Sequence, residues 1–119
     1  MSSILIIEDA PNLVINLKKL IKEVGGFKLI QQASTINEAK VVLTFSDPEI
    51  VILDLDLPDG SGMDLIPIIK NQTKAIVIIF TNHSDKLFQK NAFNLGVDHF
   101  LDKVKDVDKL LDLLSVYSS

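Results

Sequence analysis

The fold of this chain is decided by residues 50–62, which read IVILDLDLPDGSG. The stretch opens with four apolar residues, three of them β-branched, a composition typical of a buried strand. The apolar run then gives way to Asp54 and to the turn residues Pro58, Asp59 and Gly60. Open α/β folds bind their ligands outside the carboxyl ends of the strands, so Asp54 lies where chemistry is expected.

Apolar runs and amphipathic segments alternate along the whole chain. This alternation predicts an α/β fold in which a doubly wound parallel sheet carries helices on both faces, with right-handed crossovers. The strand order does not follow from periodicity. The predicted strands are residues 4–7, 28–33, 50–53, 75–80 and 97–101, and the five helices begin near Pro11, Thr35, Ser61, Ser84 and Asp106.

Composition restricts the function further. The 119 residues suffice for one domain, residues 1–119. The chain has no cysteine and no apolar run of membrane-spanning length, which fits a cytoplasmic protein that contacts no membrane. The net charge is −4 and no basic run is longer than Lys18-Lys19. Because binding to a phosphate backbone needs clustered cations, we do not expect this chain to bind nucleic acid directly.

Reactive side chains follow four of the five predicted strands. They are Glu8 and Asp9, then Asp54, then Thr81, and finally Lys103. The carboxyl ends of the strands share one edge of the sheet, so these side chains can converge. Three packed carboxylates repel, and one becomes protonated unless a cation is present. Oxygen ligands without cysteine suit Mg²⁺ or Mn²⁺.

Each of these residues also has a plainer structural interpretation. An acid pair after a strand can cap the next helix and favour its dipole. An aspartate in a turn can bond backbone amides, although Asp56 and Asp59 are better placed for this than Asp54. Thr81 could cap the loop that follows it, and a lysine such as Lys103 is usually a solvated charge. The common register of the acids and Lys103 favours the metal site.

The chain resembles the receiver domain of two-component response regulators over residues 1–117. The resemblance is carried by the acid pair, the segment that begins at Asp54, Thr81, and Lys103 with Phe100 three positions before it. It implies a flavodoxin-like, CheY-like fold with strand order 2-1-3-4-5. It also implies that a histidine kinase or a histidine phosphotransfer protein phosphorylates Asp54. Such a chain is no conventional enzyme, since it catalyses only its own phosphorylation and dephosphorylation.

The resemblance assigns the metal ligands. It implies that Asp9, Asp54 and the backbone carbonyl of Asp56 bind Mg²⁺ directly, and that Glu8 holds the ion through water.

The remaining roles also come from the resemblance. Lys103 would pair with the phosphoryl oxygens, Thr81 would move to hydrogen-bond the phosphoryl group, and Phe100 would swing inward as Thr81 moves. Asp56 and His83 flank the phosphoryl group in this family, so we expect them to tune its lifetime. The family often has proline after the lysine, where this chain has Val104.

Two rival functions and the output remain open. Asp54 and Asp56 also resemble the nucleophile and general acid of haloacid-dehalogenase-type phosphatases, although that family places this motif on its first strand. A pseudo-receiver that binds partners without phosphorylation is the second rival. The family signals through its fourth helix, fifth strand and fifth helix, where Phe93, Leu113 and Tyr117 lie off the main apolar stripes. We therefore expect a protein target or a homodimer there, for a stand-alone regulator or for one domain of a longer chain.

Overall fold

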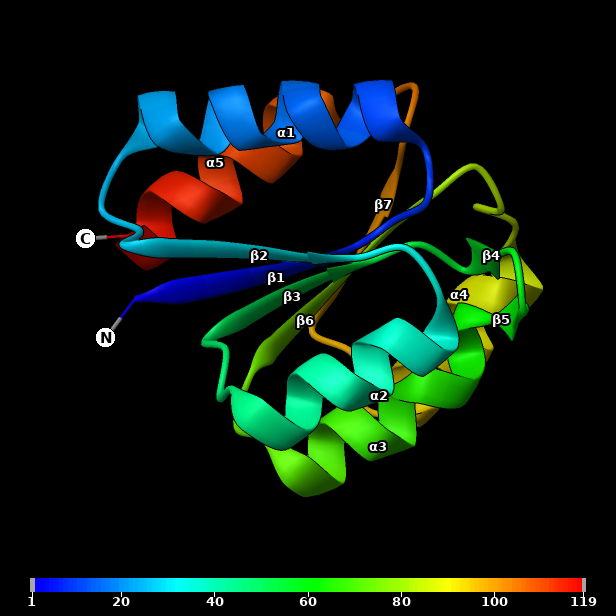
Figure 1. Cartoon of the computed structure of the whole chain (residues 1–119). Helices are drawn as coiled ribbons and strands as arrows, with labels where there is room; N and C mark the ends of the chain where they lie inside the picture. The colour runs from blue at the N-terminus through cyan, green and yellow to red at the C-terminus, as the bar shows by residue number, and fades with distance from the viewer. Residues whose placement is uncertain (1, 119) are drawn as a thin grey trace.

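The central feature of the structure, a computed structural model that describes residues 2–118, is a parallel sheet of five strands (Figure 1). The strands lie in the order β2-β1-β3-β6-β7. This is the predicted 2-1-3-4-5 order, because β4 and β5 form a separate hairpin. The doubly wound, CheY-like fold is therefore confirmed. The bounds are β1 Ser3–Ile7, β2 Leu29–Ala33, β3 Ile50–Leu53, β6 Ile76–Thr81 and β7 His99–Asp102.

Five α-helices cover the two faces of the sheet (Figure 1). Helices α1 and α5 pack on one face, and α2, α3 and α4 pack on the other. No helix within residues 2–118 is long and apolar enough to cross a bilayer. The two ends of the predicted 1–119 domain, Met1 and Ser119, lie outside the described residues. The helix bounds are α1 Pro11–Val24, α2 Ile36–Phe45, α3 Leu65–Gln72, α4 Lys86–Asn94 and α5 Val107–Ser118.

Local sequence signals explain where the first two helices begin. Proline occupies the first position of α1, where its missing N–H has no intrahelical partner. The Thr35 hydroxyl accepts a hydrogen bond from the Glu38 N–H at 3.0 Å, and the Glu38 carboxylate accepts one from the Ser34 N–H at 2.8 Å. This reciprocal pair satisfies N–H groups at the start of α2, as a capping box does.

The region after Asp54 is more ordered than the predicted simple turn. Residues Asp56–Leu57 (β4) and Gly60–Ser61 (β5) pair as a short antiparallel hairpin. A 3₁₀ turn, Gly62–Asp64, then precedes α3. The Ser61 hydroxyl accepts from the N–H of Met63 at 3.2 Å, so Ser61 caps this 3₁₀ turn. The sequence had suggested instead that Ser61 begins the helix α3.

Two strands end later than predicted. Strand β6 ends at Thr81 instead of Phe80, and β7 ends at Asp102 instead of Leu101. Thr81 and Asp102 are register partners, and the Lys103 N–H donates to the Thr81 carbonyl oxygen at 3.0 Å. The last residue of each strand is decided by pairing with the neighbouring strand, and the β-propensity of a residue does not predict that pairing.

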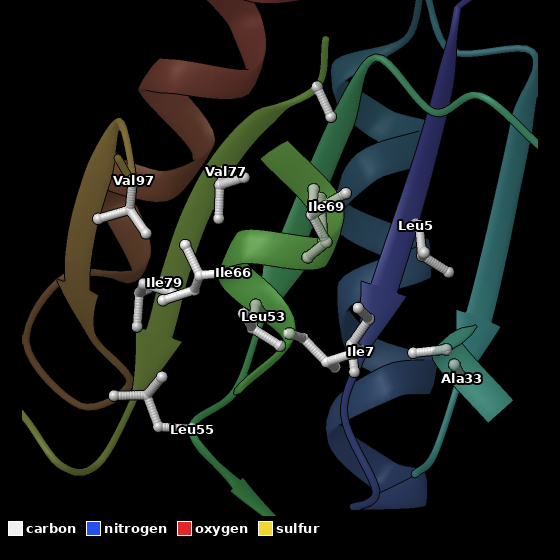
Figure 2. Close-up of a cluster of buried hydrophobic side chains, with 14 of the residues drawn as sticks. Leu5, Ile7, Ala33, Leu53, Leu55, Ile66, Ile69, Val77, Ile79 and Val97 are labelled. Carbon is white, nitrogen blue, oxygen red and sulfur yellow. The ribbon is translucent and has the colours of Figure 1, made fainter. Parts of the chain in front are cut away.

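The sheet is buried on both faces, which gives Asp54 a rigid support. All four residues of β3 are buried, as expected for a central parallel strand. Figure 2 shows the cluster on the α2–α4 face, where Leu53 and Ile79 of the sheet lie against Ile66 and Ile69 of α3. Ile52 points to the opposite layer, beneath α1 and α5.

Candidate functional site

Asp54 and Glu8 lie side by side at the carboxyl edge of the sheet. Both residues are only 3% exposed. Their backbones are tied to neighbouring strands, because the Asp54 N–H donates to Ile7 O at 3.0 Å and the Glu8 N–H donates to Ala33 O at 2.9 Å. The two carboxylates are therefore held in place by the sheet ladder.

Lys103 follows β7 and brings a positive charge to these two acids, across two strands to Asp54 and across three to Glu8. Its Nζ lies 2.6 Å from Glu8 Oε1 and 2.8 Å from Asp54 Oδ2, and its side chain is 14% exposed. It is therefore not a solvated lysine. Burial by itself lowers the pKa of Lys103, but hydrogen bonds to Asp54 and Glu8, with their charges, outweigh burial and leave the pKa raised. Lys103 is charged at neutral pH.

Glu8 is held between its lysine partner and its acidic neighbour. Burial raises the pKa of Glu8 and the Asp54 charge adds to this effect, while hydrogen bonds from Lys103 and from the Ala10 N–H oppose it. The pKa is raised overall. Glu8 Oε2 accepts the Ala10 bond at 3.0 Å, just before α1. Glu8 thus bonds to the residue before α1, while within the described chain α1 has no side-chain cap and no acid in its first turn.

Asp9 completes an acidic cluster on the solvent side. Glu8, Asp9 and Asp54 each offer a carboxylate oxygen, and these oxygens lie within 4.8 Å of one another. Asp9 is exposed, while the other two are buried. A set of three carboxylates with an open side fits Mg²⁺, which prefers oxygen ligands and keeps several waters. The fourth predicted ligand is the backbone carbonyl of Asp56, and the N–H of the same residue donates to Asp54 Oδ1 at 3.3 Å.

Thr81 and Phe100 lie on the two neighbouring strands. Thr81 is the last residue of β6 and is fully buried. Its hydroxyl accepts a hydrogen bond from the His83 N–H at 3.2 Å, so in this structure Thr81 caps its own loop, one of the alternatives that the sequence allowed. Phe100 in β7 is partly buried and packs against the core layer beneath α2–α4.

Asp56 and His83 form a contact that the sequence did not indicate. His83 Nε2 lies 2.6 Å from Asp56 Oδ2, and both side chains are exposed. The His83 ring also lies against Phe88 of α4, with ring centroids 5.4 Å apart. These residues line part of a pocket of about 300 Å³ that also includes Leu55 and the β5 residues Gly60 and Ser61. Only the adjacency of β3 and β6 in the sheet brings the two loops together.

Asp54 and Asp59 differ from the prediction in their hydrogen bonding. The sequence suggested that the turn does not need Asp54, but the Asp54 carboxylate accepts from the Asp56 N–H. Asp59 does not serve the turn alone, because its two carboxylate oxygens accept from the N–H groups of Ile36 at 2.8 Å and Asn37 at 3.1 Å. Asp59 is therefore an N-terminal cap for α2, contributed from 22 or more residues away in the chain.

Gly62 is a further residue whose importance the sequence did not reveal. A Cβ atom at this position would collide with the carbonyl oxygen of Asp54. The Gly62 N–H also donates to the carbonyl oxygen of Leu55 at 2.8 Å. The backbone of Gly62 therefore packs directly against the backbone of the central aspartate, and only glycine allows this approach.

Comparison with known proteins identifies this arrangement. The family model described as the response regulator receiver domain matches residues 4–115. The chain belongs to this family. Receiver domains of this family are signalling proteins of two-component systems and not conventional enzymes.

Individual relatives agree with the family. Transcriptional regulatory protein CitT of Bacillus subtilis is 30% identical over 101 residues, which cover 84% of this chain and 45% of that protein. The receiver chain thus spans about half the length of the curated relatives it matches. A two-component response regulator from Clostridium difficile has the same fold, with a TM-score of 0.88, 26% identity, and coverage of 98% of this chain and 94% of that chain.

A further solved structure shows the fold in a phosphorylated protein. It is a response regulator from Burkholderia pseudomallei, described with a phosphorylated aspartic acid, a calcium ion and citrate. Its TM-score is 0.87 at 23% identity, with 99% of this chain and 69% of that chain covered. At this identity the likeness concerns the fold.

Proposed function

We propose that this receiver chain accepts a phosphoryl group on Asp54 from a histidine kinase or a histidine phosphotransfer protein. The observation that carries the proposal is the buried Asp54 carboxylate, which lies 2.8 Å from Lys103 Nζ within the acidic cluster. In the reaction, an Asp54 oxygen forms a P–O bond while the P–N bond of the donor phosphohistidine breaks. The imidazole of the donor is the leaving group.

Transfer of this kind depends mainly on positioning and on neutralising charge. Lys103 is suited to hold phosphoryl oxygens, because its Nζ already lies between Glu8 and Asp54. An electrostatic donor of this type typically contributes about 3 kcal/mol to lowering a barrier. The rigid anchoring of Asp54 in the sheet keeps its carboxylate aligned for attack.

The residues that we propose to hold Mg²⁺, or Mn²⁺ in its place, are Asp9, Asp54 and the backbone carbonyl of Asp56, with Glu8 acting through water. The oxygen donors and the exposed position of Asp9 support this set. When bound, the ion would supply charge neutralisation for the phosphoryl oxygens. The positive charge of Lys103 would then still offset the negative charge of Glu8, which lies 2.6 Å away.

The switch after transfer would begin at Thr81. Its hydroxyl is bonded to the His83 N–H, so a move toward the phosphoryl group requires that this bond break. Phe100 is only partly buried, which leaves it free to move further into the core as Thr81 moves.

The lifetime of the phosphoryl group would depend on Asp56 and His83. These side chains contact one another, and each lies two residues after a residue of the site, Asp54 or Thr81, so both are placed to meet a water that attacks the phosphoryl group. Replacing both with alanine is expected to change the autodephosphorylation rate. An unchanged rate would show that the pair is only a surface contact.

The output surface is proposed to be α4, β7 and α5, through a protein target or a homodimer. Three large apolar side chains of the α4 region are exposed there, Leu87 at 67%, Phe93 at 49% and Leu95 at 41%. Leu113 and Tyr117 are partly buried against the core, so they contribute less than predicted. Light scattering that shows a dimer only in the phosphorylated protein would support self-association, and a monomer in both states would leave another protein as the target.

The proposed function is tested with acetyl phosphate or beryllofluoride in the presence of Mg²⁺. With acetyl phosphate, intact mass should show one added phosphoryl group on the wild type and none on Asp54→Asn. No response of the wild type, or an equal response of Asp54→Asn, would favour the pseudo-receiver. Turnover of a phosphomonoester would favour the phosphatase of the haloacid-dehalogenase type.

A further inference from the structure

The carboxylate of Asp102, the last residue of β7, is held by hydrogen bonds from two different loops. Its Oδ1 accepts from the N–H groups of Val104 at 2.7 Å and Lys105 at 3.0 Å. Its Oδ2 accepts from the Ser84 hydroxyl at 2.6 Å. The pKa of Asp102 is lowered because the Ser84 hydroxyl and these two N–H groups stabilise its charged form. An ionised Asp102 is thus part of the folded arrangement.

These bonds fix the backbone on both sides of Lys103. The Asp102 N–H donates to Asp106 Oδ2 at 2.8 Å, and the Lys103 N–H donates to Thr81 O at 3.0 Å. The turn from Asp102 to Lys105 therefore closes around Lys103 through the Asp102 side chain. A lysine side chain loses rotamer entropy when its ammonium group is held in one place. Because the backbone of Lys103 is already fixed, no further backbone entropy is lost when Lys103 reaches across β6 to Asp54.

The residue after Lys103 is suited to this turn. Receiver domains often have proline at this position, but proline has no N–H to donate. Val104 donates its N–H to Asp102, in the shorter of the two bonds to Oδ1. The peptide bond between Lys103 and Val104 is trans, since residues 2–118 contain no cis bond. The bond from Val104 to Asp102 therefore constrains the backbone directly after Lys103.

The Ser84 contact connects this turn to the loop that follows Thr81. Ser84 lies between His83 and the start of α4, and its carbonyl oxygen accepts from Gln89 Nε2 at 2.7 Å. Ser84 is therefore itself held against α4. Its bond to Asp102 joins the loop after β6 to the loop that carries Lys103.

We infer that Asp102 is the positioning residue for Lys103, and that Ser84 holds the Asp102 carboxylate in the orientation that the turn requires. The inference rests on the proposed function for its role in phosphorylation, but the placement of Lys103 can be measured without any phosphoryl donor. Without Asp102, the Lys103 ammonium group separates from Glu8 and Asp54 more often.

The experiment measures hydrogen exchange of the Lys103 ammonium group by ¹⁵N NMR, in the wild type, Asp102→Ala and Asp102→Asn. Asp102→Ala should speed exchange by about tenfold or more, because hydrogen bonds to a charged group no longer hold the turn closed. Asp102→Asn should stay within about threefold of the wild type, since its oxygen still accepts both N–H bonds and its amide can donate to the Ser84 oxygen. Wild-type exchange in Asp102→Ala, or equally fast exchange in both variants, would overturn the inference.

Ser84→Ala provides a milder variant if Asp102→Ala does not fold. It removes one bond and keeps the turn, so we expect exchange to rise by about twofold to threefold. Unchanged exchange in Ser84→Ala would overturn the role of Ser84, and it would decide against the inference if Asp102→Ala is unfolded.

Phosphorylation by acetyl phosphate separates the inference from the proposed function. Asp102→Ala should react at least about tenfold more slowly, because small misplacements of a reacting group are costly. Its Mg²⁺ affinity should not fall, because Asp102 is not in the acidic cluster and a displaced Lys103 leaves the three carboxylates with less positive charge beside them. If the wild type itself does not react, the proposed function fails, and the exchange experiment still tests the position of Lys103.

Discussion

Replacing Lys103 with methionine removes the positive charge of the site while keeping a long side chain. In the wild type Lys103 Nζ lies 2.6 Å from Glu8 and 2.8 Å from Asp54, and its side chain is 14% exposed. The substitution leaves two buried carboxylates facing each other without a cation. Removing one partner of a buried ion pair typically costs about 3–5 kcal/mol.

Protonation of Glu8 limits this cost. A carboxyl group with an ordinary pKa of about 4.3 takes up a proton at pH 7 at a cost of about 4 kcal/mol, or about 1.4 kcal/mol per pH unit. We therefore expect Lys103→Met to destabilise the fold by about 3–4 kcal/mol at pH 7 and by about 1 kcal/mol at pH 5.

The direction of the pH dependence follows from the pKa of Glu8, which is already raised by burial in the wild type. An acid whose folded-state pKa is raised stabilises the fold at pH values below its unfolded pKa. That stabilisation is lost as the pH rises through the folded-state pKa. Without Lys103 the pKa of Glu8 rises further, so the variant loses more stability towards neutral pH than the wild type does.

Urea denaturation at pH 5, 6 and 7 without Mg²⁺ measures this difference. Lys109→Met is the matched control, because Lys109 is 73% exposed and lies 3.5 Å from Asp106, so its loss should cost about 0.5 kcal/mol or less. Adding Glu8→Gln to Lys103→Met should remove most of the pH dependence. A penalty below about 1 kcal/mol at pH 7, or an equal penalty at pH 5 and pH 7, would refute the reasoning.

Three further predictions follow from the other contacts. Gly62→Ala places a methyl group against the Asp54 carbonyl oxygen, so thermal denaturation should show a loss of about 1–3 kcal/mol, whereas wild-type stability would mean that the backbone yields freely. Thr35→Ala removes the acceptor for the Glu38 N–H and should cost about 1 kcal/mol in urea, unless the Asp59 cap alone holds α2. The pKa of Asp59 is lowered, mainly by the hydrogen bond from the N–H at the start of α2. Asp59 therefore stabilises the fold above its unfolded pKa of about 3.9, and this stabilisation is lost as the pH falls through its folded pKa. Asp59→Asn should therefore flatten the stability profile below about pH 4, and a profile parallel to the wild type would contradict the assignment.

Much of the fold was predictable because it depends on local patterns. The apolar runs and the helix signals at Pro11 and Thr35 act within a few residues, so the alternation of strands and helices could be read directly. The strand order came from the resemblance, since periodicity does not say which strands are neighbours. The exact ends of β6 and β7 were missed because they depend on pairing between strands.

The candidate site shows the same division. The residue types and their positions after strands predicted that Glu8, Asp54 and Lys103 meet, because parallel strands share one carboxyl edge. The contact of Asp56 with His83 was not predictable, because it joins two loops whose conformations depend on each other.

The sequence by itself determined that a buried strand would present Asp54 at the edge of an α/β sheet, among acids and a lysine. This information lies in hydrophobic periodicity and residue chemistry, which act locally. The tertiary structure alone decided how the loops hold these groups. Asp59 caps a helix distant in sequence, and the Ser84 hydroxyl from the loop after β6 bonds to Asp102 at the end of β7. These contacts join segments whose relative positions exist only after the strands have paired, so no local pattern records them.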